Sequence, residues 1–148
     1  MQLTGPVALG LLWAMGASSA LGACTVAVGT PGLLALSADG TQLGSDLGVA
    51  SVMTISNINL LGSTITLSDP RLDGSSPNLP GAIVEDAYSA TWLLGLGQSS
   101  GGYTSSSHSF TVPGVANLVV TIVLNNRVTS AGGFMQGNYK TRTTVDCT

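Results

Sequence analysis

Short runs of alternating apolar and polar residues cover most of the chain, and turn-forming residues separate them. Alternation with a period of two is typical of half-buried β-strands, whereas an amphipathic helix repeats about every 3.6 residues. No convincing helical period occurs after residue 23. The pattern predicts strands over residues 24–28, 33–37, 51–58, 63–69, 82–94, 107–112, 117–128 and 138–147.

Clusters of Gly, Pro, Asn, Asp and Ser between these runs predict the turns. They fall at residues 29–32, 37–48, 73–81, 95–106, 113–116 and 129–137. Seven or eight short strands joined by frequent turns are typical of an antiparallel β-sandwich. We therefore expect one all-β domain over residues 24–148.

The predicted strands differ in how many of their faces are apolar. Residues 117–124 are apolar on both faces, which predicts either a central strand covered on both sides or a contact with another subunit. Aromatic residues are few, so we expect four of them to supply much of the core volume: Tyr88, Trp92, Phe110 and Tyr139.

The N-terminal segment, residues 1–23, is predicted to be a secretory signal peptide. An apolar stretch from Pro6 to about Ala17 is followed by small residues that lead to Cys24. This is the order of a signal peptide's apolar and cleavage regions, although no Lys or Arg precedes the apolar stretch. A buried N-terminal helix or an uncleaved anchor is the alternative. Export would place the mature chain, residues 24–148, in the periplasm, on the cell surface or outside the cell.

The two cysteines, Cys24 and Cys147, lie near the two ends of the predicted mature chain. On the expected strands, Cys24 shares a face with Val26, and Cys147 shares a face with Val145. An even number of cysteines in an exported chain favours a disulfide between Cys24 and Cys147. Two alternatives stay open: two free thiols, or a lipoprotein acylated at Cys24, because residues 21–24 (LGAC) resemble a lipobox.

Charged residues make up only 7% of the 148 residues, and the net charge is −3. The mean hydropathy is +0.43, yet no apolar run after residue 23 is long enough for a membrane-spanning helix. Nucleic-acid binding requires several clustered Lys or Arg residues, and this chain has four in all. We expect no nucleic-acid partner and no transmembrane span in the mature chain.

The sequence predicts no catalytic residues, metal site or cofactor. His108 is the only histidine, and four nearby serines lead us to expect a solvated loop residue. One His and two distant Cys do not make a zinc site, and Asp39 and Asp73 lie in sequences typical of turns. Glu85 and Asp86 are adjacent, so on a strand they point to opposite faces and cannot act together.

Residues 137–148, GNYKTRTTVDCT, resemble the last strand of spore coat protein U-like domains and of chaperone–usher pilus subunits. An exported chain that opens with ACTV and ends in such a strand is also similar to small secreted proteins of Gram-negative bacteria. The resemblance implies an immunoglobulin-like sandwich that assembles on the cell surface, often by strand exchange. Pilin-type domains commonly bridge two cysteines in their N-terminal half, and this chain does not. In addition, Cys147 replaces the penultimate aromatic residue that pilin chaperones recognise.

These observations together predict a non-enzymatic exported structural or cell-surface protein. Low charge and edge strands suit self-association by strand pairing, so we expect a homo-oligomer or other surface subunits as partners. The alternative is a monomeric extracellular binding or adhesion module that presents the turns at residues 99–107 or 73–81 to a ligand of unknown identity.

Overall fold

The computed structural model describes residues 24–148, so the predicted signal peptide at residues 1–23 lies outside the described residues. These residues form twelve strands and one short 3-10 turn, η1 (Leu93–Gly95). The strands are β1 (Thr25–Thr30), β2 (Leu33–Leu36), β3 (Gln42–Val49), β4 (Ser51–Ser56), β5 (Ser63–Leu67), β6 (Arg71–Leu72), β7 (Ile83–Trp92), β8 (Gly97–Thr104), β9 (His108–Val112), β10 (Val120–Thr129), β11 (Thr141–Arg142) and β12 (Val145–Cys147). No helix among residues 24–148 is long and apolar enough to cross a membrane. The prediction of an all-β chain is confirmed.

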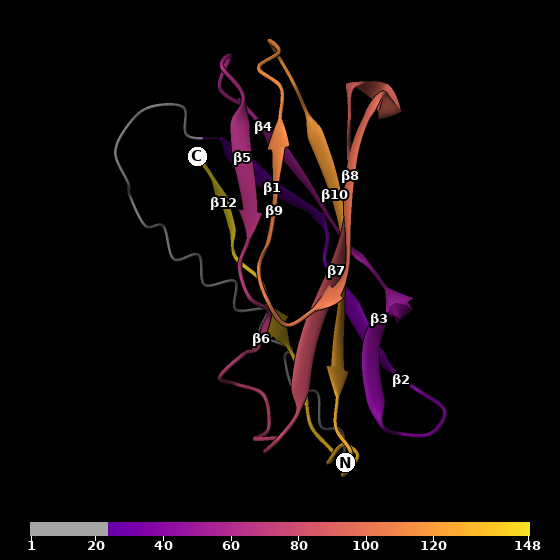
Figure 1. Cartoon of the computed structure of the whole chain (residues 1–148). Coiled ribbons are helices and arrows are strands. Elements are labelled where there is room, and N and C mark those ends of the chain that lie inside the picture. Colours follow the sequence, from indigo (N-terminus) through magenta and orange to yellow (C-terminus); the bar gives the residue numbers. More distant parts are fainter. Residues whose placement is uncertain (1–23) are drawn as a thin grey trace, which may run out of the picture.

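The larger sheet has seven strands and is organised around β10 (Figure 1). On one side, β10 pairs with β7 along its whole length, and β7 in turn pairs with β8. On the other side, residues 120–124 pair with β4 and residues 127–129 pair with β3. Strands β1 and β2 complete this side by pairing with β4 and β3, respectively. All of these pairings are antiparallel, as the sequence predicts.

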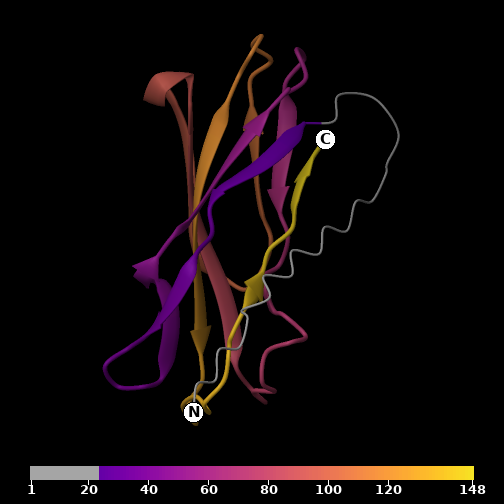
Figure 2. The same cartoon turned by 180° about the vertical axis from the view of Figure 1, so that it is seen from behind.

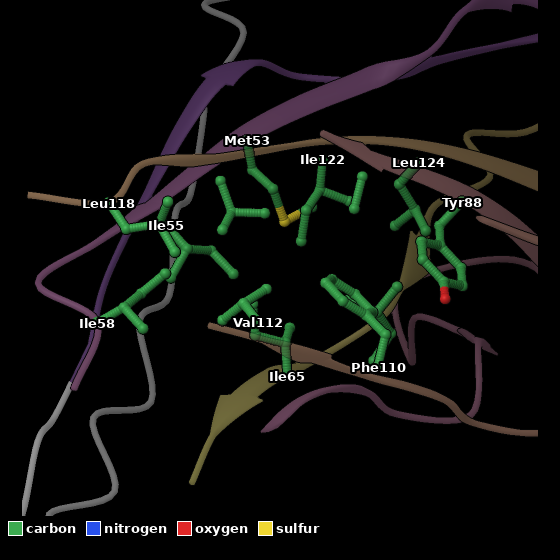
Figure 3. Packing of buried hydrophobic residues seen from close by; sticks show 13 residues of the cluster. Met53, Ile55, Ile58, Ile65, Tyr88, Phe110, Val112, Leu118, Ile122 and Leu124 are labelled. Atoms are coloured by element: carbon green, nitrogen blue, oxygen red, sulfur yellow. The ribbon is translucent and has the colours of Figure 1, made fainter. Parts of the chain in front are cut away.

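A smaller sheet, in the order β12-β5-β9, forms the second layer (Figure 2). Strand β6 pairs separately with β11. The core lies between the two layers. Figure 3 shows Met53, Ile122 and Leu124 of the larger sheet opposite Ile65 and Val112 of the smaller one. All five are buried. The alternating pattern therefore places one apolar face of each layer against the other.

The central strand predicted for residues 117–124 is confirmed in part, since β10 is central but begins at Val120. The side chains of Val120, Ile122 and Leu124 are buried, and β10 has partners on both sides. Its outward face is only half-covered, since Val123 is half-buried. The apolar residues on the outward face of β10 therefore do not indicate a second buried layer. They are residues that favour β-strands and are partly covered by their neighbours.

Two predicted turns are wrong in part, because most of β3 falls within residues 37–48 and β8 lies within residues 95–106. The sequence of β8, GQSSGGYT, has low intrinsic strand propensity. Its pairing with the long strand β7 overrides that local preference. The predicted last strand is also interrupted, since residues 138–140 lie outside strands and β11 and β12 are separate.

Three of the four aromatic residues expected in the core pack there. Tyr88 and Phe110 are buried, and Trp92 stacks on Phe110 at a centroid distance of 6.2 Å. Tyr139 does not reach the core. Its ring packs against Phe134 at 5.3 Å, and its hydroxyl donates to the carbonyl oxygen of Met135 at 2.9 Å. The expectation for Tyr139 is wrong because a surface turn supplies its partners.

Candidate functional site

A buried carboxylate, Asp86, is the most unusual polar group in the described chain. It lies on β7 with 0% of its surface exposed, on the face that also buries Tyr88 and Ala90. The alternation along β7 directs Asp86 into the space between the layers and Glu85 away from it. A carboxylate in such a place must find hydrogen-bond partners, because burying an unpaired charge costs several kcal/mol.

Two side chains from distant parts of the sequence lie against the carboxyl group, and one of them, Thr143, donates a hydrogen bond to it. The Thr143 hydroxyl, between β11 and β12, donates to Oδ2 of Asp86 at 2.9 Å. Nε2 of His108, at the start of β9, lies 3.1 Å from Oδ1 and also 3.1 Å from the backbone oxygen of Asp86. The backbone oxygen can only accept a hydrogen bond, so the proton is assigned to Nε2. Its N–H aligns with the backbone oxygen, and Oδ1 receives no directed hydrogen bond, which makes the contact with Oδ1 electrostatic.

Aromatic and glycine residues enclose this group, which we call the Asp86 cluster (Asp86, His108 and Thr143). The Tyr88 ring meets the His108 ring edge-on at a centroid distance of 4.8 Å, and the Tyr88 hydroxyl lies 2.8 Å from Oγ of Ser99. Gly101 on β8 lies against both rings, and a Cβ there would collide with them. The cluster therefore connects the two layers, because Asp86 belongs to the larger sheet and His108 to the smaller one.

Burial raises the pKa of Asp86 above its ordinary value of 3.8, because the charged form loses its hydration. The hydrogen bond from Thr143 and the nearby His108 both favour the charged form and oppose this rise, while the negative charge of Asp69 adds to it. Desolvation is the largest of these effects.

Among the described residues, the three members of the Asp86 cluster do not form a nucleophilic triad with one another. A triad needs a hydroxyl or thiol next to the histidine nitrogen that is not held by the carboxylate. Here the cluster's only hydroxyl, on Thr143, donates to Asp86 and makes no hydrogen bond to His108. The chemistry that this geometry supports is the pairing of buried polar groups across the core.

The expectation that His108 is a solvated loop residue is wrong. Its side chain is only 10% exposed, and it opens strand β9. The neighbouring serines are typical of a loop, but the imidazole points into the core, where its Nε2 contacts the buried Asp86. Sequence analysis also missed Thr143. The one available signal was an acidic residue on the apolar face of a strand, where an unpaired charge is not tolerated.

Glu85 and Asp86 do act separately, as predicted. Glu85 lies opposite Arg127 in the β7–β10 ladder, and the Arg127 Nη2 and Nε atoms donate to its Oε2 at 2.8 and 3.1 Å. The Arg127 guanidinium also lies over the Tyr103 ring, 3.9 Å from its centroid. These groups line the outward face of the sheet, away from the Asp86 cluster.

The structure pairs Cys24 with Cys147, the disulfide that the sequence favours over free thiols or acylation of Cys24. The two Cα atoms are 6.1 Å apart, and the bridge spans a sequence separation of 123 residues. Both cysteines are half-buried against the core. Because the Cys24 sulfur is bonded to Cys147, no thiol remains there for a lipid chain.

The acidic residues predicted to form turns do so. Asp39 accepts hydrogen bonds from the Ser37 hydroxyl and the Thr41 amide, and these bonds lower its pKa. Asp73 accepts from the amide and hydroxyl of Ser75, which lower its pKa in the same way. Among residues 24–148, no three His, Cys, Asp or Glu side chains gather in a way that could hold a metal ion.

Comparisons with known proteins do not place this chain in a family. No family model, no curated protein and no solved structure matches it.

Substituting Asp86→Asn tests the buried carboxylate through its pH dependence. The raised pKa means that the folded protein binds this proton more tightly than the unfolded chain does. Protonation of Asp86 therefore contributes stability at acidic pH, and this contribution is lost as the pH rises through the folded pKa of Asp86. The amide introduced by Asp86→Asn binds no such proton, so urea unfolding should show the wild type gaining stability over this variant on acidification. If the free energy of unfolding of the wild type, relative to that of Asp86→Asn, stayed constant or fell on acidification, the raised pKa of Asp86 would be contradicted.

Proposed function

We propose that this chain is an exported, non-enzymatic structural or cell-surface protein whose immunoglobulin-like sandwich self-associates by pairing of sheet edges. One feature of the described residues supports this proposal besides the export signal expected at residues 1–23. The disulfide between Cys24 and Cys147 suits an oxidising compartment outside the cytoplasm.

The observation that carries the self-association is the unprotected edge strand β8. Among residues 24–148 it pairs only with β7, so its other side offers free backbone N–H and C=O groups. Natural edge strands are usually blunted by charged residues, proline or a short length. Strand β8 has eight residues, GQSSGGYT, and none of them is charged or proline. Such an edge is suited to pairing with a second copy.

The disulfide favours pairing of edges over donation of a strand. Strand β1 follows Cys24 directly, and β12 ends at Cys147, so the bridge ties one edge strand of each sheet to the other. A donated terminal strand would have to leave its sheet while still linked to the other terminus. Edge pairing along β8 needs no such rearrangement.

The variant Ser100→Lys tests this proposal, because it places a charge at an exposed position of β8. The wild type should show a mass that rises with concentration in sedimentation equilibrium. Ser100→Lys should weaken this association by about tenfold or more, because a charged side chain on an edge strand opposes pairing with another strand. The matched control is Asn78→Lys, which adds the same charge in a loop outside the β8 edge and should associate like the wild type. A wild type that stays monomeric at all concentrations would overturn the proposal.

The alternative of a monomeric binding module has one supporting feature, a pocket of about 380 Å³ at the β6–β11 pair. Arg71 and Arg142 lie directly opposite each other in this ladder and line the pocket, together with Asp69 and Asp73. Nη2 of Arg142 donates a hydrogen bond to Oδ2 of Asp73 at 2.7 Å, and the two side chains form an ion pair. A monomer in the sedimentation experiment would favour this alternative.

A further inference from the structure

Three loops at one end of the molecule carry large apolar side chains that nothing in the described chain covers. The loops connect β4 to β5 (residues 57–62), β7 to β8 (93–96) and β9 to β10 (113–119). The exposed fractions are 66% for Leu60, 94% for Leu61, 38% for Leu93, 107% for Leu94, 89% for Leu96, 38% for Val115 and 49% for Val119. We call these seven residues the apolar tip.

Strand pairing brings the three loops to the same end. Ile55 pairs with Val120, and Val120 also pairs with Trp92, so the strands that flank all three loops lie side by side there. Ser63 pairs with Val112, and Gly114 lies so close to the backbone of Leu60 that a Cβ would collide with it. Both views place all three loops at the top of Figures 1 and 2, with the β7–β8 turn to one side of the other two.

The apolar tip contains no charged residue. Loops 57–62 (NINLLG), 93–96 (LLGL) and 113–119 (PGVANLV) lack Asp, Glu, Lys, Arg and His altogether. Soluble monomers rarely gather exposed apolar side chains in one place without a function for them. The absence of basic residues also means that this end offers no attraction to anionic groups.

The turn between β7 and β8 keeps leucine where its backbone is unfavourable. Leu93 and Leu94 have φ values of 51° and 56°, in the left-handed region that Gly and Asn prefer. The Leu96 amide donates to the Leu93 carbonyl oxygen at 3.1 Å, so Leu94 and Gly95 are the central residues of a tight hairpin turn. Asn-Gly is the favoured pair in such turns. Leucine in this conformation carries a backbone cost, which points to a role for its exposed side chain.

The predicted export segment joins the domain at this same end. Thr25 pairs with Ser56, the residue before loop 57–62, and Asn57 donates to the Thr25 hydroxyl at 2.9 Å. Residues 1–23, which contain no charged side chain, therefore connect at Cys24 beside the apolar tip. During export through a membrane, this end of the domain follows the apolar segment most closely.

We propose that the apolar tip inserts into the interface of an uncharged lipid membrane. The side chains stand on separate projecting loops, a shape that penetrates a deformable apolar phase more readily than it fits a second rigid copy. Insertion removes the leucine side chains from water, the main source of binding energy for interfacial segments. The tip lies at the ends of the strands, whereas the β8 edge runs along the side, so membrane contact and self-association are separable.

Flotation with phosphatidylcholine vesicles tests the proposal on the full chain, in the N-terminal form that an exporting host produces. The wild type should float with the vesicles, and the triple variant Leu61→Ser, Leu94→Ser, Leu96→Ser should lose at least about tenfold in partition coefficient. The matched control carries Leu33→Ser, Leu36→Ser and Leu47→Ser, three leucines that are at least half-exposed on β2 and β3. It should partition like the wild type. Residues 1–23 are treated identically in all three proteins, so they do not affect the comparison.

A second variant separates membrane contact from folding. Leu94→Asn creates the favoured turn sequence, so it should fold with equal or greater stability and yet partition more weakly than the wild type. Trp92 lies directly before the turn, and in a Trp13→Phe background its fluorescence should be quenched by lipids with brominated chains. Equal partition of tip and control variants, or no quenching of Trp92, would overturn the proposal. A tip variant that changes only the mass in sedimentation would also overturn it and would assign the tip to self-association.

Discussion

Replacing both cysteines, Cys24→Ser and Cys147→Ser, is expected to lower the free energy of unfolding by about 4–5 kcal/mol. The bridge closes a loop with a sequence separation of 123 residues, which is nearly all of the described chain. Without the bridge, the unfolded chain gains the freedom to separate its ends, and folding has to overcome that entropy. A loss of this size is a large part of the stability of a typical small domain.

Urea unfolding of the oxidised wild type, the reduced wild type and the double variant measures this effect. The reduced wild type and the double variant should unfold at similar denaturant concentrations, because both lack the same covalent link. We also expect proteolysis to begin at β12, which is only three residues long and pairs only with β5 among the described strands. A double variant as stable as the oxidised protein would show that the bridge contributes nothing to folding.

Truncating Ile122→Ala should lower the free energy of unfolding by about 3–4 kcal/mol. Ile122 is completely buried on β10, with Met53 and Ala90 as its neighbours in the adjacent strands. The substitution removes apolar contacts with both layers and leaves a cavity that the paired strands on either side cannot close. The large effect follows from the central position of β10.

The matched control is Ile83→Ala, the same chemical change on the neighbouring strand β7. Ile83 is 55% exposed, so its truncation should cost about 1 kcal/mol or less. Thermal unfolding of the two variants compares an isoleucine in the core with one at the surface. Equal losses would contradict the assignment of Ile122 to the core.

The strands with regular alternation could be predicted from sequence, because the alternation of apolar and polar residues indicates which side of the strand is buried. β5 and β10 have this pattern, and residues 141–148 alternate between half-buried and exposed side chains as predicted. Strand β8 could not be predicted, because its Gly and Ser residues become a strand only through pairing with β7. Local preference was overridden there by a long-range partner.

The Asp86 cluster could not be predicted for a related reason. Its members are 22 and 57 residues apart in the chain, and no local pattern links an acidic residue on one strand to a histidine on another. Sequence analysis correctly placed Asp86 away from Glu85 but did not identify what would compensate for its burial. The disulfide was predictable because the chain contains only two cysteines, each on the apolar face of a terminal strand.

The intact mass of the protein recovered from an exporting Gram-negative host, with and without reductant, tests the central claim most directly. The proposal of an exported, disulfide-closed domain predicts a chain that begins near Cys24 and gains the mass of two hydrogen atoms on reduction. A chain that keeps residues 1–23 and carries two free thiols would contradict it. So would a mass increased by acyl chains at Cys24, with Cys147 reacting as a free thiol.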